Sequence, residues 1–169
     1  MRVHPDRLTG PASEVCDEAY RSYGSLLYRL SYGFLLNQAD AEDAVQEVFY
    51  RLMTRLPRFE SEAHRRAWLL HVAANVCRDM LRRRKRRQTE ALDDNLEAAP
   101  AAEENQVLRC ILALPDSYRQ VFLLHYLEGL DLAETGRLLK LRASAVKMRL
   151  SRGRTLLRAA LEKEGIPYD

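Results

Sequence analysis

Residues 114–161 read LPDSYRQVFLLHYLEGLDLAETGRLLKLRASAVKMRLSRGRTLLRAAL, and the second half of this stretch is strongly basic. Residues 137–158 hold eight Lys or Arg side chains and no Asp or Glu, so the segment attracts phosphates. Asp131 stands three residues before Glu134 and ahead of an apolar run, which is typical of a capping box that starts a short helix. Gly129 is placed to end the preceding helix. The pattern predicts a helix-turn-helix that binds DNA.

The second helix of this unit is expected to follow a short connection at residues 140–142. Its apolar positions recur at helical spacing, with Gly153 among them, where another helix can approach closely; they are Val146, Leu150, Leu157 and Leu161. A separate face carries Lys147, Met148, Ser151 and Arg152, and this face is free to enter a major groove. The competing interpretation is a solvated basic helix, which is disfavoured because ordinary surface helices mix both signs of charge.

The rest of the sequence is also helical by its apolar periodicity. Glycine is scarce, prolines fall at segment boundaries and strand signals are nearly absent. We expect helices over residues 13–36, 40–56 and 63–86. The expected buried stripes are Val45, Val48, Phe49, Leu52, Met53 and Leu56 on the second helix, and Trp68, Leu69, Val72, Ala73, Val76, Met80 and Leu81 on the third. The fold class is therefore all-α, with two small helical bundles.

Charge is unevenly distributed along the chain, although the net charge is only +3. Residues 82–87 (RRRKRR) carry six positive charges in a row, whereas residues 88–106 carry six acidic side chains and no basic one. This composition favours a flexible acidic linker between the two bundles. The expected organisation is an N-terminal tail (1–12), an N-terminal bundle (13–87), the linker (88–105) and a C-terminal helix-turn-helix domain (106–169).

The three cysteines are interpreted as reduced, mostly buried thiols of a cytosolic protein. Cys16, Cys77 and Cys110 are widely separated and form no CxxC pair, so we expect neither a metal site nor a cofactor. No apolar run approaches the roughly 18 residues that a membrane span needs, and the N-terminus lacks the apolar core of a signal peptide. These features favour a soluble, intracellular protein with no membrane insertion.

Two further segments carry a resemblance to a known family. Residues 40–52 read DAEDAVQEVFYRL, and residues 66–87 read RAWLLHVAANVCRDMLRRRKRR. These segments resemble region 2 of the bacterial sigma-70 family, and residues 114–157 resemble its region 4; the chain is most similar to the small extracytoplasmic-function group. The resemblance implies a non-catalytic subunit that binds core RNA polymerase and directs it to a promoter.

On the second expected helix, a polar face lies opposite the apolar stripe. The resemblance implies that it binds the clamp helices of the β′ subunit of core RNA polymerase, through Asp40, Asp43, Gln46, Glu47 and Tyr50. Without the resemblance, an ordinary solvated face would be the favoured interpretation. An acid–base catalytic pair at Asp43 and Glu47 is less favoured still, because nothing in the sequence predicts burial of these carboxylates or a charged partner for them.

The third expected helix and the loop before it form the candidate site for the −10 element of the promoter. An amide such as that of Asn75 can bond a base edge, and arginines can hold phosphates. The resemblance implies that this region captures a flipped base of the non-template strand, and binding of the extruded strand promotes melting. The candidate residues are Phe59, Glu60, Ser61, His71, Asn75, Arg78, Arg82 and Arg83. Trp68 is interpreted as a core anchor, and the run 82–87 as a grip on duplex phosphates.

In the C-terminal helix, the resemblance implies that the −35 element is contacted by Arg142, Lys147, Met148, Ser151 and Arg152. Here the chain departs from the usual family pattern. Met148 cannot donate a hydrogen bond to a base, although it can contact a thymine methyl group. Lys140 stands where a turn glycine is common, so a left-handed backbone there would cost about 1 kcal/mol.

The resemblance also implies two regulatory features. An anti-sigma factor is expected to cover the polymerase-binding surfaces, and it could hold the protein at the membrane. The acidic linker is expected to mimic nucleic acid near the polymerase active-site cleft. The main rival is an autonomous helix-turn-helix regulator, which explains residues 114–161 equally well but not residues 40–52 and 66–87 together. An enzyme is disfavoured, because the sequence shows no metal-carboxylate cluster and no Ser/His/Asp arrangement.

Overall fold

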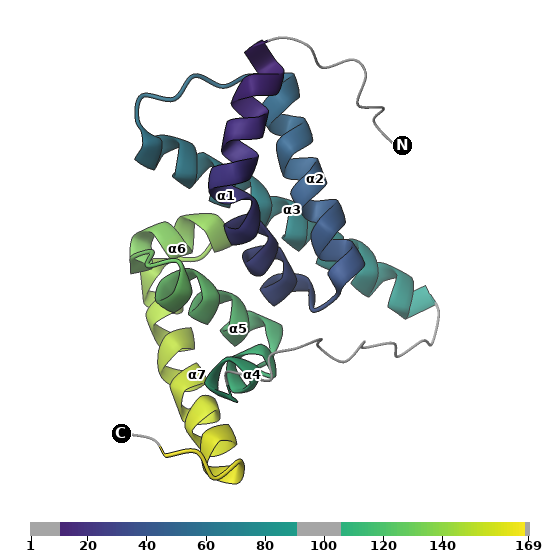
Figure 1. The fold of residues 1–169 in the computed structure, drawn as a ribbon. Coiled ribbons are helices and arrows are strands. Elements are labelled where there is room, and N and C mark those ends of the chain that lie inside the picture. The colour runs from purple at the N-terminus through teal and green to yellow at the C-terminus, as the bar shows by residue number, and fades with distance from the viewer. Residues whose placement is uncertain (1–10, 91–105, 168–169) are drawn as a thin grey trace.

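The computed structural model describes residues 11–90 and 106–167, and every regular element within them is helical. Figure 1 shows the helices in two groups, one above the other. The first group holds α1 (Pro11–Leu35), α2 (Gln38–Arg55) and α3 (Glu62–Glu90). The second holds α4 (Gln106–Leu112), α5 (Asp116–Phe122), a π-helical segment η2 (Leu123–Leu127), α6 (Leu132–Leu139) and α7 (Ala143–Lys163). The predicted all-α fold is confirmed.

The three predicted N-terminal helices are found, with shifted ends. The largest shift is at the end of α3, which continues to Glu90 through the basic run, because Arg, Lys and Gln are good helix formers. Residues 88–90, which we had expected in the linker, are therefore helical. The remainder of the expected linker (91–105) and most of the expected N-terminal tail (1–10) lie outside the described residues.

The core of the first group is formed by the apolar stripes of α1, α2 and α3. Phe34, Val48 and Leu69 are all fully buried there. The predicted stripe of α2 is largely confirmed, but Leu56 is 52% exposed. Leu56 follows the last helical residue and has a left-handed backbone (φ 40°), and this turn before Pro57 carries its side chain away from the core.

The second group is organised around the long helix α7. Its apolar stripe is buried as predicted, at Val146, Leu150, Leu157 and Leu161. Gly153 lies against Phe122 of α5, and a Cβ atom there would come within 2.5 Å of the Phe122 ring. The close helix–helix approach expected at this glycine is confirmed.

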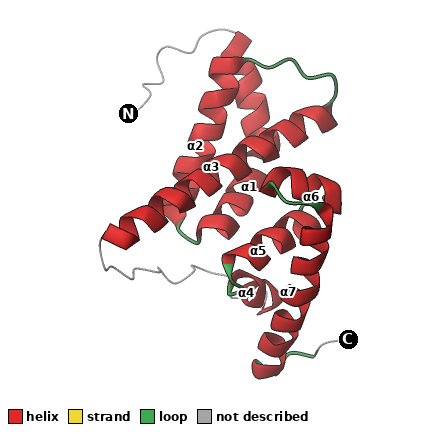
Figure 2. Ribbon diagram, turned by 180° about the vertical axis from the view of Figure 1, so that it is seen from behind, coloured by secondary structure: helices red, strands yellow, loops and turns green. Residues whose placement is uncertain are grey.

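The two groups pack against each other, and their buried residues form one continuous cluster. The last turns of α1 lie against α5 and η2, and α3 lies against α6, as Figure 2 shows from behind. At Gly33 of α1, a Cβ atom would lie 2.5 Å from Cδ1 of Leu123. Besides its predicted stripe, α3 also buries Leu70 and Ala74, which the sequence analysis did not identify, and Cys77, whose burial it expected.

Candidate nucleic-acid and polymerase interface

Two local features that the sequence predicted define where the first helix of the helix-turn-helix begins and where the helix before it ends. Asp131 caps α6, because its carboxylate accepts from the Glu134 amide at 2.7 Å while the Glu134 carboxylate accepts from the Asp131 amide at 2.9 Å. Gly129 has a positive φ of 69°, and the Leu130 amide reaches back to the Leu124 carbonyl at 3.1 Å. Both the capping box and the glycine that ends the preceding helix are confirmed.

The turn between α6 and α7 is closed by Lys140 in a left-handed conformation (φ 55°, ψ 45°). The Leu141 amide donates to the Gly136 carbonyl at 2.8 Å, and a Cβ atom on Gly136 would lie 2.6 Å from the Leu141 oxygen. The turn thus requires glycine at position 136, where a Cβ atom would collide with the backbone, but it has lysine at position 140, where φ is positive. The strain considered for Lys140 is present.

The first half of α7 presents its polar face to solvent. Arg142 precedes the helix, and the candidate −35 residues that follow it on α7 are also exposed: Lys147, Met148, Ser151 and Arg152. Met148 is 48% exposed, so an apolar group stands among the cations. These five side chains lie along the start of one helix, which is the geometry of a recognition helix in a major groove.

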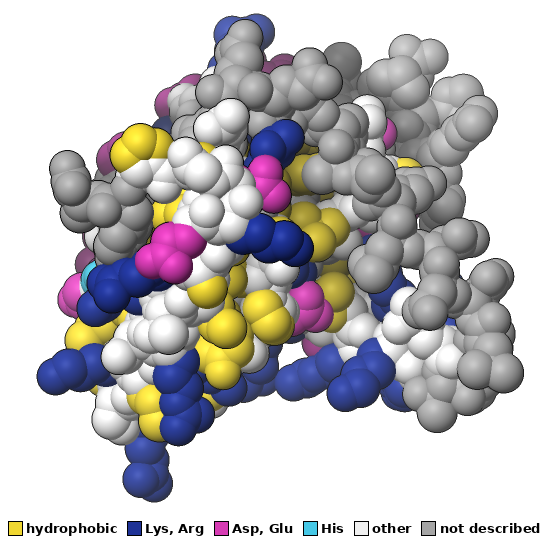
Figure 3. All heavy atoms as spheres, turned by 90° about the horizontal axis from the view of Figure 1, so that it is seen from below, with side chains coloured by type: hydrophobic (Ala, Val, Ile, Leu, Met, Phe, Trp, Pro, Cys, Tyr) yellow, Lys and Arg dark blue, Asp and Glu magenta, His cyan; other side chains and the backbone are white. Residues whose placement is uncertain are grey.

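Farther along α7, Arg154 donates to the Tyr126 hydroxyl at 3.1 Å. Figure 3 looks at the molecule from below, and Lys and Arg side chains gather along the lower edge of that face.

The candidate −10 stripe on α3 is only partly open to solvent. His71, Arg82 and Arg83 are exposed, whereas Asn75 and Arg78 are half-buried. Arg78 donates to the Leu138 carbonyl of α6 at 3.2 Å. Burial, and then repulsion from Arg82, lowers the pKa of the Arg78 guanidinium. The second helical group therefore covers part of this stripe.

The loop before α3 is held by its own side chains. Ser61 caps α3, because its hydroxyl accepts from the His64 amide at 3.1 Å. The Phe59 ring meets Trp68 edge-on, with centroids 5.8 Å apart. Trp68 is half-buried against the core, in keeping with its interpretation as a core anchor. Among the three candidate residues of the loop, Glu60 and Ser61 are exposed and Phe59 is half-buried.

The candidate polymerase-binding residues share the outer face of α2. Asp43, Gln46 and Tyr50 are exposed, and Glu47 forms an ion pair with Arg51 at 2.7 Å. Asp40 lies at the start of the helix and pairs with Arg84 of α3. The open part of this surface, which we call the α2 ridge, is accordingly Asp43, Gln46, Glu47 and Tyr50.

Two arginines have roles that the sequence analysis did not assign. Arg84 belongs to the basic run, yet it donates to the Leu35 carbonyl at 2.9 Å as well as to Asp40, so it joins α3 to the end of α1. Arg119 of α5 is only 4% exposed and bonds residues of both helical groups. The sequence did offer one signal for Arg119, since it is a charged residue next to the apolar run that begins at Val121.

Three further observations on the described part of the chain concern metal ligands, cysteines and membrane spans. No group of His, Cys, Asp and Glu side chains in residues 11–90 or 106–167 is arranged to hold a metal ion. The three cysteines are free; Cys77 and Cys110 are buried and Cys16 is half-buried. None of the described helices is both long enough and apolar enough to cross a bilayer.

Comparison with known proteins matches two segments of the chain, and these segments correspond to the two helical groups of the structure. Residues 19–87 match the model of sigma-70 region 2, and residues 104–157 match the model of sigma-70 region 4. The chain is 32% identical over 159 residues to the ECF RNA polymerase sigma factor SigE of Mycolicibacterium smegmatis, spanning 87% of this chain and 62% of that protein. It is 31% identical over 164 residues to the ECF RNA polymerase sigma factor SigW of Bacillus subtilis, spanning 82% of this chain and 84% of that protein.

Solved structures with the same fold include two protein complexes. The sigma factor RpoE in complex with the anti-sigma factor NepR from Bartonella quintana aligns with a TM-score of 0.73 at 18% identity, over 88% of this chain and 98% of that one. CnrH in complex with the cytosolic domain of CnrY aligns with a TM-score of 0.62 at 25% identity, over 89% of each chain. Because both regions are matched in order and SigW is similar over most of its length, the chain belongs to the sigma-70 family and is an ECF-type RNA polymerase sigma factor.

Proposed function

We propose that the protein is an alternative sigma subunit that binds core RNA polymerase, recognises −10 and −35 promoter elements and promotes melting at the −10 element. The observation that carries this proposal is the presence of both sigma regions on one chain, in order, with an exposed polar ridge on the first and an exposed cationic recognition helix on the second. The autonomous regulator is not favoured, because it leaves the region 2 match at residues 19–87 without a role.

Each part of the function is assigned to the surface whose chemistry suits it. The α2 ridge would dock on the β′ clamp helices, with two acidic and two polar side chains facing a basic partner. The stripe from His71 to Arg83 on α3 would hold the melted −10 strand, with Asn75 contacting a base and the arginines contacting phosphates. The start of α7 would read the −35 element in the major groove.

The docking surface can be tested by co-elution with bacterial core RNA polymerase. The parent should co-elute, and the Asp43→Ala/Gln46→Ala/Glu47→Ala variant should not, since it removes the polar groups of the ridge while leaving the buried stripe intact. Glu14→Ala/Asp17→Ala is a matched control, because it removes exposed acids from α1. If no protein binds core while the parent alone shifts a specific duplex, the autonomous regulator is the better description.

The −35 assignment can be tested on a promoter found by sequencing transcripts that the holoenzyme makes from genomic DNA. Lys147→Ala/Arg152→Ala should weaken promoter binding and reduce the slope of log affinity against log salt by about 2, if each side chain neutralises one phosphate. Met148→Ala should instead change the preference among −35 sequences, because a thioether adds no charge contact. If the slope of log affinity against log salt is unchanged in this variant, Lys147 and Arg152 do not contact DNA phosphates.

An anti-sigma factor is the second proposed partner. It would compete with polymerase for the α2 ridge, and a membrane-bound factor of this kind would hold the protein at the membrane. The sigma factor RpoE, which has the same fold and was solved in complex with the anti-sigma factor NepR, supports this proposal by analogy. A co-expressed anti-sigma factor should lose affinity for the triple ridge variant; simultaneous binding of polymerase and regulator would contradict competition.

A further inference from the structure

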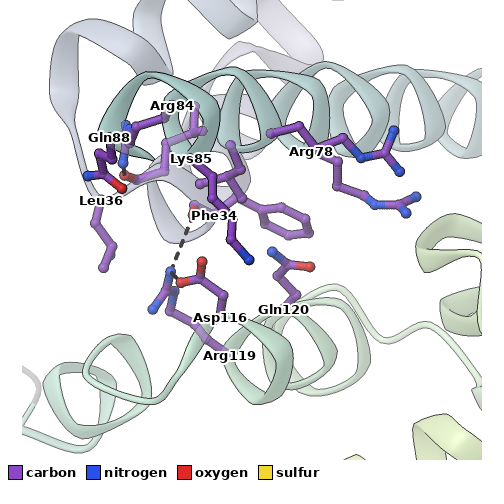
Figure 4. A pocket seen from close by; sticks show the side chains of 12 residues that line it. Phe34, Leu36, Arg78, Arg84, Lys85, Gln88, Asp116, Arg119 and Gln120 are labelled. Carbon is purple, nitrogen blue, oxygen red and sulfur yellow. Dashed lines mark hydrogen bonds and ion pairs between the residues drawn. The ribbon is translucent and has the colours of Figure 1, made fainter. Parts of the chain in front are cut away.

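A cavity of about 510 Å³ lies where the C-terminal part of α3 faces α5. Its volume falls within the range of roughly 300–1,000 Å³ that small-molecule sites occupy in proteins. Figure 4 shows Lys85 extending from α3 toward α5 and Gln120 extending from α5 toward α3. The space is therefore bordered by polar side chains of both helical groups, and it is large enough for a small organic ligand.

The lining of this cavity is mainly cationic. It includes five Lys or Arg side chains but only one acidic side chain, that of Asp116. The Asp116 carboxylate pairs with Arg119, so it does not offset the charge of the side chains on α3. A concave surface that carries one sign of charge raises the local concentration of oppositely charged ligands. The cavity should accordingly attract anions.

Two of the five cations are used within the protein. Arg84 donates to the Leu35 carbonyl at 2.9 Å and pairs with Asp40. Arg119 is only 4% exposed and donates to the Gly33 carbonyl of α1 at 2.7 Å. These two arginines hold the end of α1 in place at the edge of the cavity. The cations that a ligand could reach are therefore those of α3.

One face of α3 supplies these reachable cations. Arg78, Arg82 and Lys85 follow one another at spacings of four and three residues, so they share the face that lines the cavity. Arg82 and Lys85 are exposed and Arg78 is half-buried. Arg83 and Arg86 belong to the same basic run but are not part of the lining. The run 82–87 therefore has one side toward the cavity and another side away from it.

Arg78 and Arg82 are poorly balanced by the acidic side chain near them. Burial, and then repulsion from Arg82, lowers the pKa of the Arg78 guanidinium, although Asp79 opposes this change. Nη1 of Arg82 lies 3.6 Å from Oδ1 of Asp79, and both side chains are exposed, so this ion pair is weak. A phosphate bound to both guanidinium groups would offset their repulsion and form charge-assisted hydrogen bonds.

The other end of the cavity has a different chemistry. Figure 4 shows Leu36 and Gln88 at one end and Arg78 at the other. Leu36 is half-buried and presents an apolar surface, while the amide of Gln88 can both donate and accept hydrogen bonds. An inorganic phosphate ion would leave most of this volume empty. A nucleotide combines phosphates with a planar base that has apolar faces and polar edges.

We propose that this cavity binds a nucleoside diphosphate, with its phosphates at Arg78, Arg82 and Lys85 and its base at Leu36 and Gln88. The proposal goes beyond the proposed sigma function and does not depend on it. It assigns the cavity side of the basic run to a small ligand, whereas the other side remains available to DNA.

The sharpest test compares Arg82→Gln with Arg83→Gln in the full chain. The two residues are adjacent, exposed and both candidates for −10 binding, but only Arg82 lines the cavity. Fluorescence titration with N-methylanthraniloyl-ADP measures the affinity. Arg82→Gln should weaken binding about tenfold through loss of a charge-assisted hydrogen bond, and Arg83→Gln should bind as the parent does. Equal weakening by both would indicate general attraction of anions or nucleic acid to the basic run, and it would overturn the proposal.

Gln120→Glu tests the cavity from the side of α5. It places a carboxylate next to the bound phosphates, so the affinity should fall at least about tenfold. Gln106→Glu makes the same change at an exposed position of α4 and should leave the affinity unchanged. Circular dichroism verifies that the variants are folded. Equal affinity of the two folded variants would contradict the proposed site.

The parent protein alone provides a test that depends on no variant. ADP should slow amide hydrogen exchange both at the end of α3 and in α5, and it should displace the fluorescent probe better than adenosine or pyrophosphate does. Displacement by pyrophosphate as strong as that by ADP would exclude the base from the site. Absence of saturable binding up to about 1 mM probe, the upper end of common metabolite affinities, or protection confined to α3, would overturn the proposal.

Discussion

At the scale of single residues, burial decides what an arginine does in this chain. Arg152 is exposed on α7 and is available for a phosphate. Arg84 lies in the basic run 82–87, which the sequence analysis assigned to phosphates, but it bonds Leu35 and Asp40 within the protein. Arg119 is buried and completes helix ends. Removing Arg152 should therefore affect DNA binding, whereas removing Arg84 or Arg119 also affects structure.

Burial makes Cys77 chemically inert under ordinary conditions. Desolvation raises the pKa of its thiol to about 11. At pH 7 a thiol reagent should modify the half-buried Cys16 before Cys77, and Cys77 should react only after unfolding. Mass spectrometry of partly labelled protein gives the order of modification. Modification of Cys77 in the folded protein ahead of Cys16 would contradict this assignment.

The same pKa predicts how stability depends on alkaline pH. A raised folded-state pKa means that the stabilising contribution is present below the unfolded value near 9 and is lost as the pH rises toward 11. Relative to Cys77→Ala, the parent should lose at most about 3 kcal/mol of unfolding free energy over this window. Urea unfolding at several pH values measures the difference, which should be constant below pH 8.

Lys140 is a strained residue whose replacement should stabilise the protein. Its φ of 55° is left-handed, a conformation that glycine adopts without steric cost. Lys140→Gly should raise the unfolding free energy by up to about 1 kcal/mol, while Arg137→Gly, within helix α6, should lower it by about 1 kcal/mol. Urea unfolding of both variants tests the prediction, and destabilisation by Lys140→Gly would contradict it.

At the scale of elements, the short helix α6 depends on its ends more than on its length. Eight residues are too few for a helix to be stable by propensity alone. The capping box at Asp131 satisfies two amides that no helical carbonyl can reach. Packing against α7 then fixes the angle between the two helices of the motif.

Removing the capping side chain of Asp131 should lower the free energy of unfolding by a measurable amount and should affect the first turn of α6. Asp131→Ala should lower the unfolding free energy by about 1 kcal/mol, whereas Asp131→Asn should retain most of it, because an asparagine side chain also accepts from the Glu134 amide. Chemical denaturation measures both values. Hydrogen exchange should show faster exchange in the first turn of α6 in the alanine variant, and equal exchange in both variants would contradict the role of the cap.

The helix α3 illustrates an element with more than one buried face. Arg66, Leu70, Ala74 and Arg78 follow one another at four-residue spacing and so share a face. Arg66 and Arg78 bond Glu128 and the Leu138 carbonyl of the second group. The central part of α3 is thus covered by both its own group and the second one, while its basic end extends beyond them (Figure 1).

At the scale of the whole molecule, Glu128 makes the boundary between the two groups sensitive to pH. Burial raises the pKa of its carboxyl group, and Arg66 and Arg29 oppose this rise. Because the folded pKa lies above its model value of 4.5, the related stabilisation is present below that value and is lost as the pH rises through the folded pKa. The contribution of Glu128 to the free energy of unfolding should therefore be more favourable in mild acid than at neutral pH.

This pH dependence is tested by comparing the parent with Glu128→Gln. The unfolding free energy of the parent relative to this variant should fall as the pH rises from 4.5 toward neutrality. Glu162→Gln, which changes an exposed carboxyl group at the end of α7, provides the control. A difference between parent and Glu128→Gln that stays constant with pH would remove Glu128 from the pH response.

The sequence by itself determined the three N-terminal helices, the helix-turn-helix and the exposed face of α7. These features depend on residues within one or two helical turns of each other, such as Asp131 with Glu134 or Gly129 with Leu130, so a linear pattern contains the information. The resemblance supplied the candidate residues on α2 and α3, whose roles in binding remain predictions. The predicted burial of Leu56 was wrong, because apolar periodicity alone does not show where a helix ends in a residue with a left-handed backbone.

Only the tertiary structure decided which polar side chains already have hydrogen-bond or ion-pair partners within the protein. Arg119 bonds Gly33, 86 residues away, and Arg78 bonds Leu138, 60 residues away. The packing of apolar faces brings such partners together. Their separation along the sequence follows no regular spacing, so a sequence pattern cannot predict the contact. The same packing draws Arg84 and Asp40 into one pair and joins the two helical groups into one core. Local interactions fix where each helix begins and ends, and long-range burial fixes which surfaces stay free for DNA and polymerase.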